Sequence, residues 1–311
     1  MLKSFFIVLF SVFCVSGAGI LFAYSNENHG GWDEKIYKKL RSYYQSRFST
    51  DVYFVDIGSA DDSREISIFI ESLRAKRPEL LVISGEELLK ESCYELKKMK
   101  SVPVLFCGVS DFLESGLPSG NISGVGMAEP FASAIDAAER TMPPIKQICV
   151  VGDKSHFVAS QEIEMICEDK GYKCDSFFPE PRFEKIRKIL TDNVSERTVF
   201  IMLGLKKIID EHNNIVADSK IAKAIEENGV RVVAIDKTWA SRGALCGALP
   251  EAVHHAELIC EMGDEIFHGR PVADLSVLVP KKGRKFINKK KADNFRLKVP
   301  DILLKDFQII R

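Results

Sequence analysis

The chain has 311 residues, and 46% of them are apolar, which is enough to bury the cores of two domains. Its 43 lysines and arginines balance 44 aspartates and glutamates. That balance excludes the overall positive charge typical of proteins that bind nucleic acid or anionic membranes. The local basic tract Lys281–Lys291 contains one aromatic residue, Phe286, so we interpret it as a solvated surface and expect no nucleic-acid partner.

The first 18 residues have the pattern of a secretory signal peptide. Lys3 precedes an apolar run, Ser4–Val15, and the small residues Ser16-Gly17-Ala18 follow it. We therefore expect residues 1–18 to be cleaved and the mature chain to be periplasmic or extracellular. The alternative is an N-terminal membrane anchor, because Phe5–Tyr24 is close to the ~20 residues that span a bilayer.

The cysteines show no pattern of a metal site. No CxxC pair and no cysteine–histidine spacing typical of zinc occurs, and we expect neither a metal nor another cofactor. Cys167 and Cys174 flank a predicted helix-to-strand turn, which leaves open a disulfide between them in an oxidising compartment.

Short apolar strands alternate with amphipathic helices after the signal pattern. We predict strands at 19–24, 52–56, 80–83 and 102–106, and helices at about 34–46, 63–75 and 86–99. This alternation predicts a parallel sheet with helices on both faces.

The same alternation starts again near residue 128. Strands are predicted at 147–151, 173–178, 199–203, 230–235 and 244–249, and helices at about 128–140, 155–169, 183–190, 215–227 and 251–267. An irregular C-terminal part follows. We predict an α/β protein of two Rossmann-like lobes, each with a parallel sheet, and a ligand cleft between them.

The stretch Phe106–Val125 reads FCGVSDFLESGLPSGNISGV. It is too rich in glycine and serine for a core element and too apolar at its ends for a disordered linker. We interpret it as the segment that crosses between the lobes, with Ile122 and Val125 extended and half-buried, and with conformational freedom supplied by Gly116, Gly120, Gly124 and Gly126. Asn121-Ile-Ser123 is a glycosylation sequon, which we interpret as local turn bonding.

These residues resemble the substrate-binding proteins of ABC transporters, in particular the group linked to tryptophan and other aromatic amino acids. That family carries a phrase like VFxGVSDP, then Gly-Leu, then GNxTGV. This chain has LFCGVSDF, Gly116-Leu117 and GNISGV, and Pro78–Ile83 resembles the family's PDLIVA strand. Further family landmarks occur in order from Gly243 to Pro300, so the resemblance covers nearly all of the mature chain.

The resemblance implies the periplasmic-binding-protein type I fold. Lobe 1 would span 19–126 and be completed by about 248–272, and lobe 2 would span 127–247 and be completed by about 273–311. The implied function is an extracytoplasmic, monomeric solute-binding protein that delivers a small polar or amino-acid-like molecule to an ABC permease or membrane receptor. Such a protein is not an enzyme.

The first strand also resembles extracellular sensor domains found beside histidine kinases, in which a Trp follows a Ser-Tyr strand end. Here Ala23-Tyr24-Ser25 precedes Trp32. A ligand-sensing module that feeds a signalling partner is therefore an alternative function. A secreted enzyme is a weaker one, because adjacent residues on a helix, such as His254 and His255, point about 100° apart.

Ligands of open parallel sheets bind outside the carboxyl ends of the strands. The candidate ligand-binding residues follow predicted strand ends and are Ser25, Trp32, Gly85, Glu86, Ser110, Asp111, Asp153, Ser155 and Asp236. Alternatives exist for two of them. Ser155 is equally explained as a helix N-cap, and Trp32 as a staple on Tyr37 around an Asp33 N-cap.

Two departures from the family pattern concern the ligand. The family commonly has Gly-Thr-Pro-Ala where this chain has Gly85-Glu86-Glu87-Leu88, and Phe112 replaces the proline expected after Asp111. Acidic residues in the first turn of a helix satisfy its dipole and repel an anion. We therefore expect this position to disfavour a ligand carboxylate and to suit an amine or several hydroxyls. The alternative is that Glu86 and Glu87 simply point to solvent.

Overall fold

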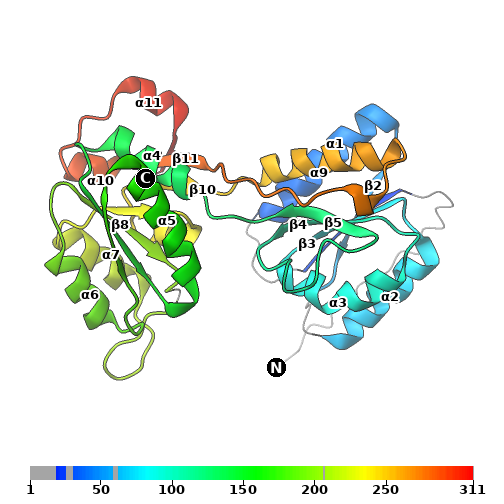
Figure 1. Cartoon of the computed structure of the whole chain (residues 1–311), viewed down its shortest axis with the longest axis horizontal. Helices are drawn as coiled ribbons and strands as arrows, with labels where there is room; N and C mark the ends of the chain where they lie inside the picture. The colour runs from blue at the N-terminus through cyan, green and yellow to red at the C-terminus, as the bar shows by residue number, and fades with distance from the viewer. Residues whose placement is uncertain (1–18, 26–30, 59–61, 206, 311) are drawn as a thin grey trace, which may run out of the picture. The chain divides into compact units, whose positions relative to one another are not determined.

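The structure is a computed structural model that describes residues 19–25, 31–58, 62–205 and 207–310 (Figure 1). The expected signal peptide, residues 1–18, lies outside the described residues. The chain forms two compact units. Unit 1 runs up to Gly126 and includes Ala252–Leu278, and unit 2 comprises Met127–Glu251 and Val279–Arg311. The returning segment of unit 1 lies a few residues later than the 248–272 expected, because β10 (Cys246–Leu249) pairs with strands of unit 2.

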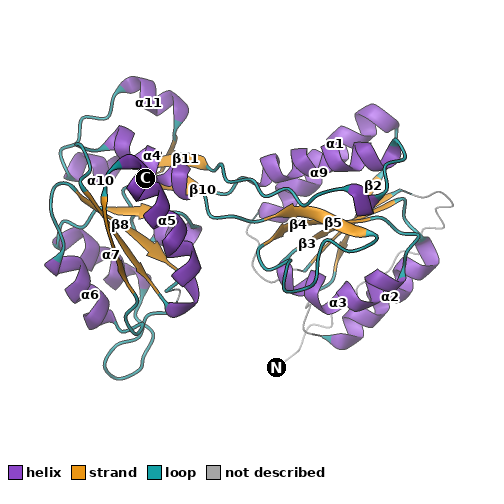
Figure 2. Ribbon diagram, viewed as in Figure 1, coloured by secondary structure: helices purple, strands orange, loops and turns teal. Residues whose placement is uncertain are grey.

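Unit 1 contains a parallel five-stranded sheet with the order β2-β1-β3-β4-β5. The strands are β1 (Ile20–Tyr24), β2 (Val52–Asp56), β3 (Leu80–Ser84), β4 (Val104–Val109) and β5 (Ile122–Gly126). Helices α1 (Trp32–Phe48) and α9 (Ala252–Phe267) cover one face, and α2 (Ser63–Lys76) and α3 (Glu86–Lys98) cover the other (Figures 1 and 2). The doubly covered parallel sheet predicted from the strand and helix pattern is confirmed.

Alternation along β1 explains this layering. Ile20 and Phe22 pack in the core under α1 and α9, whereas Leu21 and Ala23 pack in the core under α2 and α3. Successive side chains of a strand point to opposite faces, so a strand that is apolar throughout must be buried on both.

The close packing of α1 against α9 depends on a glycine in α9. A Cβ at Gly263 would overlap the Tyr44 hydroxyl oxygen, while its next contacts, Leu80 Cδ2 and Tyr44 Cζ, would lie at 3.2 Å. We expect Gly263→Ala to destabilise the protein by about 1–3 kcal/mol, the usual cost of overpacking a core. In a Tyr44→Phe background most of that cost should disappear. Equal losses of unfolding free energy in urea titrations of the two backgrounds would contradict this explanation.

The stretch Phe106–Val125 does not cross between the units as expected. Its end forms β5, which is fully buried and pairs with β4. Gly124 is required there because a Cβ would overlap the carbonyl oxygen of Phe106. The sequon does not reflect local turn bonding: the Asn121 side-chain amide donates at 2.9–3.1 Å to the carbonyls of Leu96, Met99 and Val102, which are 19–25 residues away along the chain.

Unit 2 contains a seven-stranded sheet with the order β12-β11-β10-β9-β8-β6-β7, in which only β10 and β11 pair antiparallel. Besides β10, the strands are β6 (Gln147–Gly152), β7 (Lys173–Phe177), β8 (Thr198–Leu203), β9 (Val232–Ala234), β11 (Arg284–Asn288) and β12 (Gln308–Ile310). The longer helices are α4 (Phe131–Thr141), α5 (Phe157–Lys170), α6 (Phe183–Asp192) and α7 (Asp218–Glu227). Helices α4 and α5 cover one face, and α6 and α7 the other (Figure 2).

Two features of unit 2 differ from the prediction. The C-terminal part is regular: it adds β11, β12 and the short helices α10 (Lys289–Asn294) and α11 (Asp301–Asp306). A further short helix, α8 (Lys237–Ser241), places Trp239 fully in the core. These elements are too short to show a clear period in the sequence.

Among the described residues, no helix combines the length and hydropathy needed to cross a bilayer.

Candidate functional site

The candidate residues of unit 1 lie at the carboxyl edge of its sheet. Strands β1, β3 and β4 are neighbours, and in their register Tyr24 pairs with Ser84, which pairs with Cys107. The residues that follow these strand ends, Ser25, Gly85-Glu86 and Ser110-Asp111, are therefore brought together. Ser25 and Gly85 are buried, Glu86 is half-buried, and Ser110 and Asp111 are exposed.

Glu86 and Asp111 form a carboxyl pair. Their side chains lie within hydrogen-bonding reach of each other, and the Ser110 amide nitrogen donates to Glu86 Oε2 over 3.4 Å. Burial raises the pKa of Glu86, and the hydrogen bond and negative charge of Asp111 raise it further. Glu86 therefore does not simply point to solvent.

Trp32 is the first residue of α1, and it does not form the predicted staple around an Asp33 N-cap. Its ring packs edge-on against the His255 imidazole of α9, with 5.1 Å between ring centroids. Asp33 is not an N-cap: Gly31 holds that position with a φ of 78°, and Asp33 is a buried residue of the first helical turn. Sequence reasoning missed His255 as a neighbour of the candidate site because the two helices are far apart along the chain.

A buried hydroxyl also lies at this edge. Ser84, the last residue of β3, is 1% exposed, and its Oγ has no hydrogen-bond partner within the described part of the chain. An unsatisfied buried hydroxyl is costly in a folded core. Ser84 lies at a strand end directly before Gly85, and this position in the sequence could have indicated it as a further residue of the candidate site.

The candidate residues of unit 2 lie at the corresponding edge of the second sheet. Asp153 follows β6, and its Oδ1 accepts hydrogen bonds from Ser155 N (3.1 Å), the Ser155 hydroxyl and His156 Nδ1 (2.8 Å). Burial alone would raise the pKa of Asp153, but the hydrogen bonds from Ser155 and His156 outweigh it and hold the pKa below its usual range. Asp153, and not Ser155, is the capping residue here.

His156 was missed by sequence reasoning and completes this cluster. Besides its bond to Asp153, its Nδ1 lies 3.0 Å from Ser155 Oγ. Gly204, after the adjacent strand β8, makes room for the cluster: a Cβ there would lie 2.5 Å from Asp153 Oδ2 and 2.6 Å from His156 Cε1. The D-x-S-H phrase after a predicted strand was the available signal.

Asp236 follows β9, next to β8 in the sheet, and caps α8. Its Oδ1 accepts from the Trp239 amide nitrogen over 2.8 Å, and Trp239 Nε1 donates to the Gly204 carbonyl over 3.1 Å. The carboxylate of Asp236 thus fixes the first turn of α8 at the carboxyl edge of the sheet, which is the position predicted for Asp236 from the sequence.

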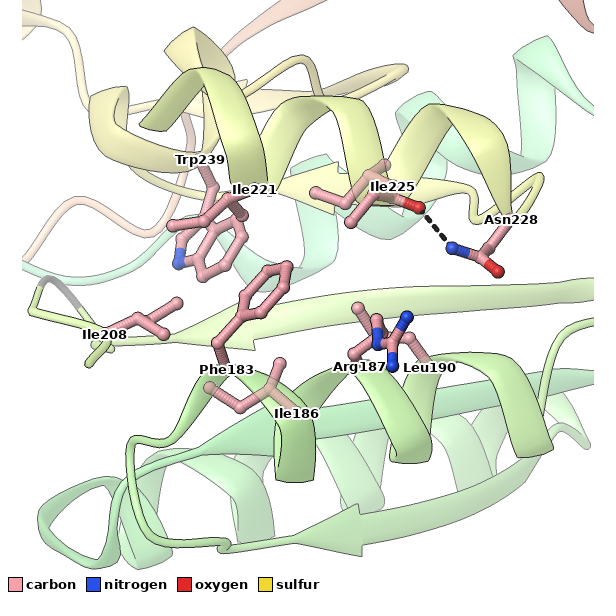
Figure 3. Close-up of a pocket in the computed structure, with 10 residues that line it drawn as sticks. Phe183, Ile186, Arg187, Leu190, Ile208, Ile221, Ile225, Asn228 and Trp239 are labelled. Atoms are coloured by element: carbon pink, nitrogen blue, oxygen red, sulfur yellow. Dashed lines mark hydrogen bonds between the residues drawn. The ribbon is translucent and has the colours of Figure 1, made fainter. Parts of the chain in front are cut away.

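Within the described part of the chain, neither the remaining histidines nor an apolar crevice of unit 2 forms a competing site. His254 is partly exposed near Glu257, whereas its neighbour His255 is buried. An apolar crevice between α6 and α7 is lined by Phe183, Ile186 and Ile221 among others, with no ionisable group beyond Arg187 at its rim (Figure 3). In the described ranges, no three His, Cys, Asp or Glu side chains gather as metal ligands.

The comparisons with known proteins bear on this arrangement. Residues 50–309 match the family described as ABC transporter substrate binding protein. The chain belongs to this family. A search of curated proteins found no match.

Several solved structures share the fold. One is an ABC domain in complex with L-Trp from Streptococcus pneumoniae, at 18% identity, 94% coverage of this chain, 100% of that chain and a TM-score of 0.64. Another is the ligand-free, open structure of a substrate-binding protein with adhesive properties from Clostridium difficile, at 14% identity, 94% and 99% coverage and a TM-score of 0.74. A periplasmic ribose ABC transporter from Conexibacter woesei has 15% identity, 90% and 94% coverage and a TM-score of 0.57. These structures confirm the periplasmic-binding-protein type of fold that was expected from the sequence.

Proposed function

We propose that this ABC transporter substrate-binding protein is exported, binds a small polar or amino-acid-like molecule in a cleft between its two lobes, and delivers it to an ABC permease. The observation that carries the proposal is the family match over residues 50–309, together with polar side chains at the carboxyl edges of both sheets. Ligands of doubly wound sheets bind at these edges. No catalytic step belongs to the proposed function.

The proposed ligand-binding residues of lobe 1 are Ser25, Trp32, Gly85, Glu86, Ser110 and Asp111. In lobe 2 they are Asp153, Ser155 and Asp236, to which we add His156. Because Ser25 and Gly85 are buried, we propose that they contribute to ligand binding through their backbone groups and through the shape they give the site. Glu86, Asp111 and Asp153 are exposed or half-buried carboxyl groups, so the ligand we propose carries an amine or several hydroxyls. Trp32 or Phe112 would supply an apolar or cation–π surface.

A ligand retained through purification tests the function directly. Denaturation of the purified protein releases the bound small molecule, which is then identified by mass spectrometry. Added back to the refolded protein, this molecule should raise the melting temperature by mass action and be recovered unchanged. Conversion to a product, at a rate that depends on His254 or His255, would replace the binding function by an enzymatic one.

Export makes a second prediction at the N-terminus. Gly19 precedes β1, an interior strand between β2 and β3, so cleavage must leave residues from Gly19 onwards in the mature protein. We expect N-terminal sequencing of the exported protein to begin near Gly19. A start at Asn26 would remove β1, and full-length protein in the membrane fraction would favour the anchor; either result would contradict cleavage near Ala18.

A further inference from the structure

Two cysteines of unit 2 lie where α5 ends and β7 begins. Cys167 is in the last turn of α5 and fully buried, and Cys174, the second residue of β7, is half-buried. The turn between them is tight: Gly171 has a left-handed φ of 73°, and Tyr172 N donates to the Cys167 carbonyl over 2.8 Å. The chain therefore folds back on the helix end and carries Cys174 to Cys167.

The two thiol groups are in contact. They lie within hydrogen-bonding reach of each other, and Cys174 packs against the core cluster that contains Cys167. The hydrogen bond between the two thiols lowers the pKa of Cys167, whereas the same bond and burial raise the pKa of Cys174, so the thiolate of the pair is on Cys167. By contrast, burial raises the thiol pKa of Cys107, Cys149, Cys246 and Cys260.

We propose that Cys167 and Cys174 form an intramolecular disulfide when the protein meets an oxidised disulfide donor. Cys174, the more exposed of the two, attacks one sulfur of the donor while its proton passes to the Cys167 thiolate; this forms a mixed disulfide and releases the first donor thiolate, which takes a proton from water. Cys167 then attacks Sγ of Cys174, and the second donor thiol leaves with the proton that Cys167 gave up. Two electrons pass from the cysteine pair to the donor, which ends as two thiols.

The position of the bond decides its effect. Among the described strands, β7 is an edge strand that pairs with β6 alone, so one of its two sides lacks a neighbouring strand. A disulfide at Cys174 ties the amino end of this strand to α5 and closes a short loop. The residues proposed to bind ligand lie at the opposite, carboxyl edge of the same sheet. Oxidation should therefore raise the stability of unit 2 and leave ligand binding unchanged.

Peptide mapping tests the proposal on the full mature chain. The reduced, folded protein is incubated with oxidised glutathione, unfolded with excess iodoacetamide and digested with trypsin. We expect the peptides Ser155–Lys170 and Cys174–Arg182 as one cross-linked species, lighter by two hydrogens than their sum, while the other cysteine peptides are alkylated. Two alkylated peptides, a stable glutathione adduct on Cys174, or a link between two molecules would overturn the proposal.

Thermal unfolding supplies an independent readout. The oxidised wild type should melt a few degrees above the reduced protein, as expected for a stabilisation of about 1 kcal/mol in a chain of this size. Cys174→Ser should lose this difference, whereas the control Cys93→Ser, in unit 1, should keep it. A difference that persists in Cys174→Ser would assign the effect to other thiols and overturn the proposal.

Discussion

Glu86→Gln is expected to weaken binding of the ligand by about 1.5–3 kcal/mol, the usual contribution of a charge-assisted hydrogen bond. The substitution keeps the shape of the side chain but removes the negative charge. Glu86 is half-buried beside Asp111 at the sheet edge. A cationic or hydroxyl group of the ligand would donate a hydrogen bond to its carboxylate oxygens there. Calorimetry with the ligand identified from the purified protein measures the loss.

A matched control lies next to it. Glu87 is in the same first turn of α3 but is exposed, so Glu87→Gln should change the affinity little. Equal losses of affinity in the two variants would show that the effect comes from the net charge at the N-terminus of α3. Wild-type affinity in Glu86→Gln, or a ligand that is a simple carboxylate, would disprove the proposed contact.

The same pair makes binding depend on pH. Burial and the neighbouring Asp111 raise the pKa of Glu86 above its ordinary value of 4.5. A cationic ligand favours the ionised carboxylate, so binding lowers the pKa of Glu86 and releases a proton. Affinity should therefore fall as the pH falls through the raised pKa, and Glu86→Gln should flatten this dependence.

Gly247→Ala is expected to have the largest effect on stability. Gly247 lies in β10, and a Cβ there would overlap the carbonyl oxygen of Ala234 and lie 2.8 Å from that residue's backbone nitrogen and carbonyl carbon. Backbone atoms of a paired strand cannot move aside as a side chain can. We expect unfolding to become easier by at least about 3 kcal/mol, the upper end of the cost of overpacking.

Gly229→Ala, also in unit 2, is the control. No atom lies within 4 Å of a Cβ at Gly229, but its φ of 64° is left-handed. Its cost should be limited to the conformational strain of about 1–2 kcal/mol. Chemical denaturation followed by circular dichroism compares the two variants. Similar midpoints for Gly247→Ala and Gly229→Ala would show that the backbone overlap is relieved by a small shift of β10.

Local patterns determined most of the architecture. Apolar strands such as Leu80–Ser84, alternating with amphipathic helices, predict parallel sheets because only a doubly covered sheet buries such strands on both faces. The positions of Glu86, Asp111 and Asp153 after strand ends followed from the same pattern, since parallel strands bring their carboxyl ends to one edge. Phrases such as GVSDF and GNISGV indicated the family before any fold was known.

Only the tertiary structure decided which groups meet. Strand order placed Glu86 against Asp111, helix packing placed His255 against Trp32, and a tight turn placed Cys174 against Cys167. It also made β5 a strand: Gly124 reads as a flexible residue in the sequence, but in the fold it is the residue small enough to lie beside Phe106. These contacts join residues by the packing of whole elements, which one-dimensional periodicity does not contain. The periodicity of a segment states which face is buried, whereas the partner on that face is set by the fold as a whole.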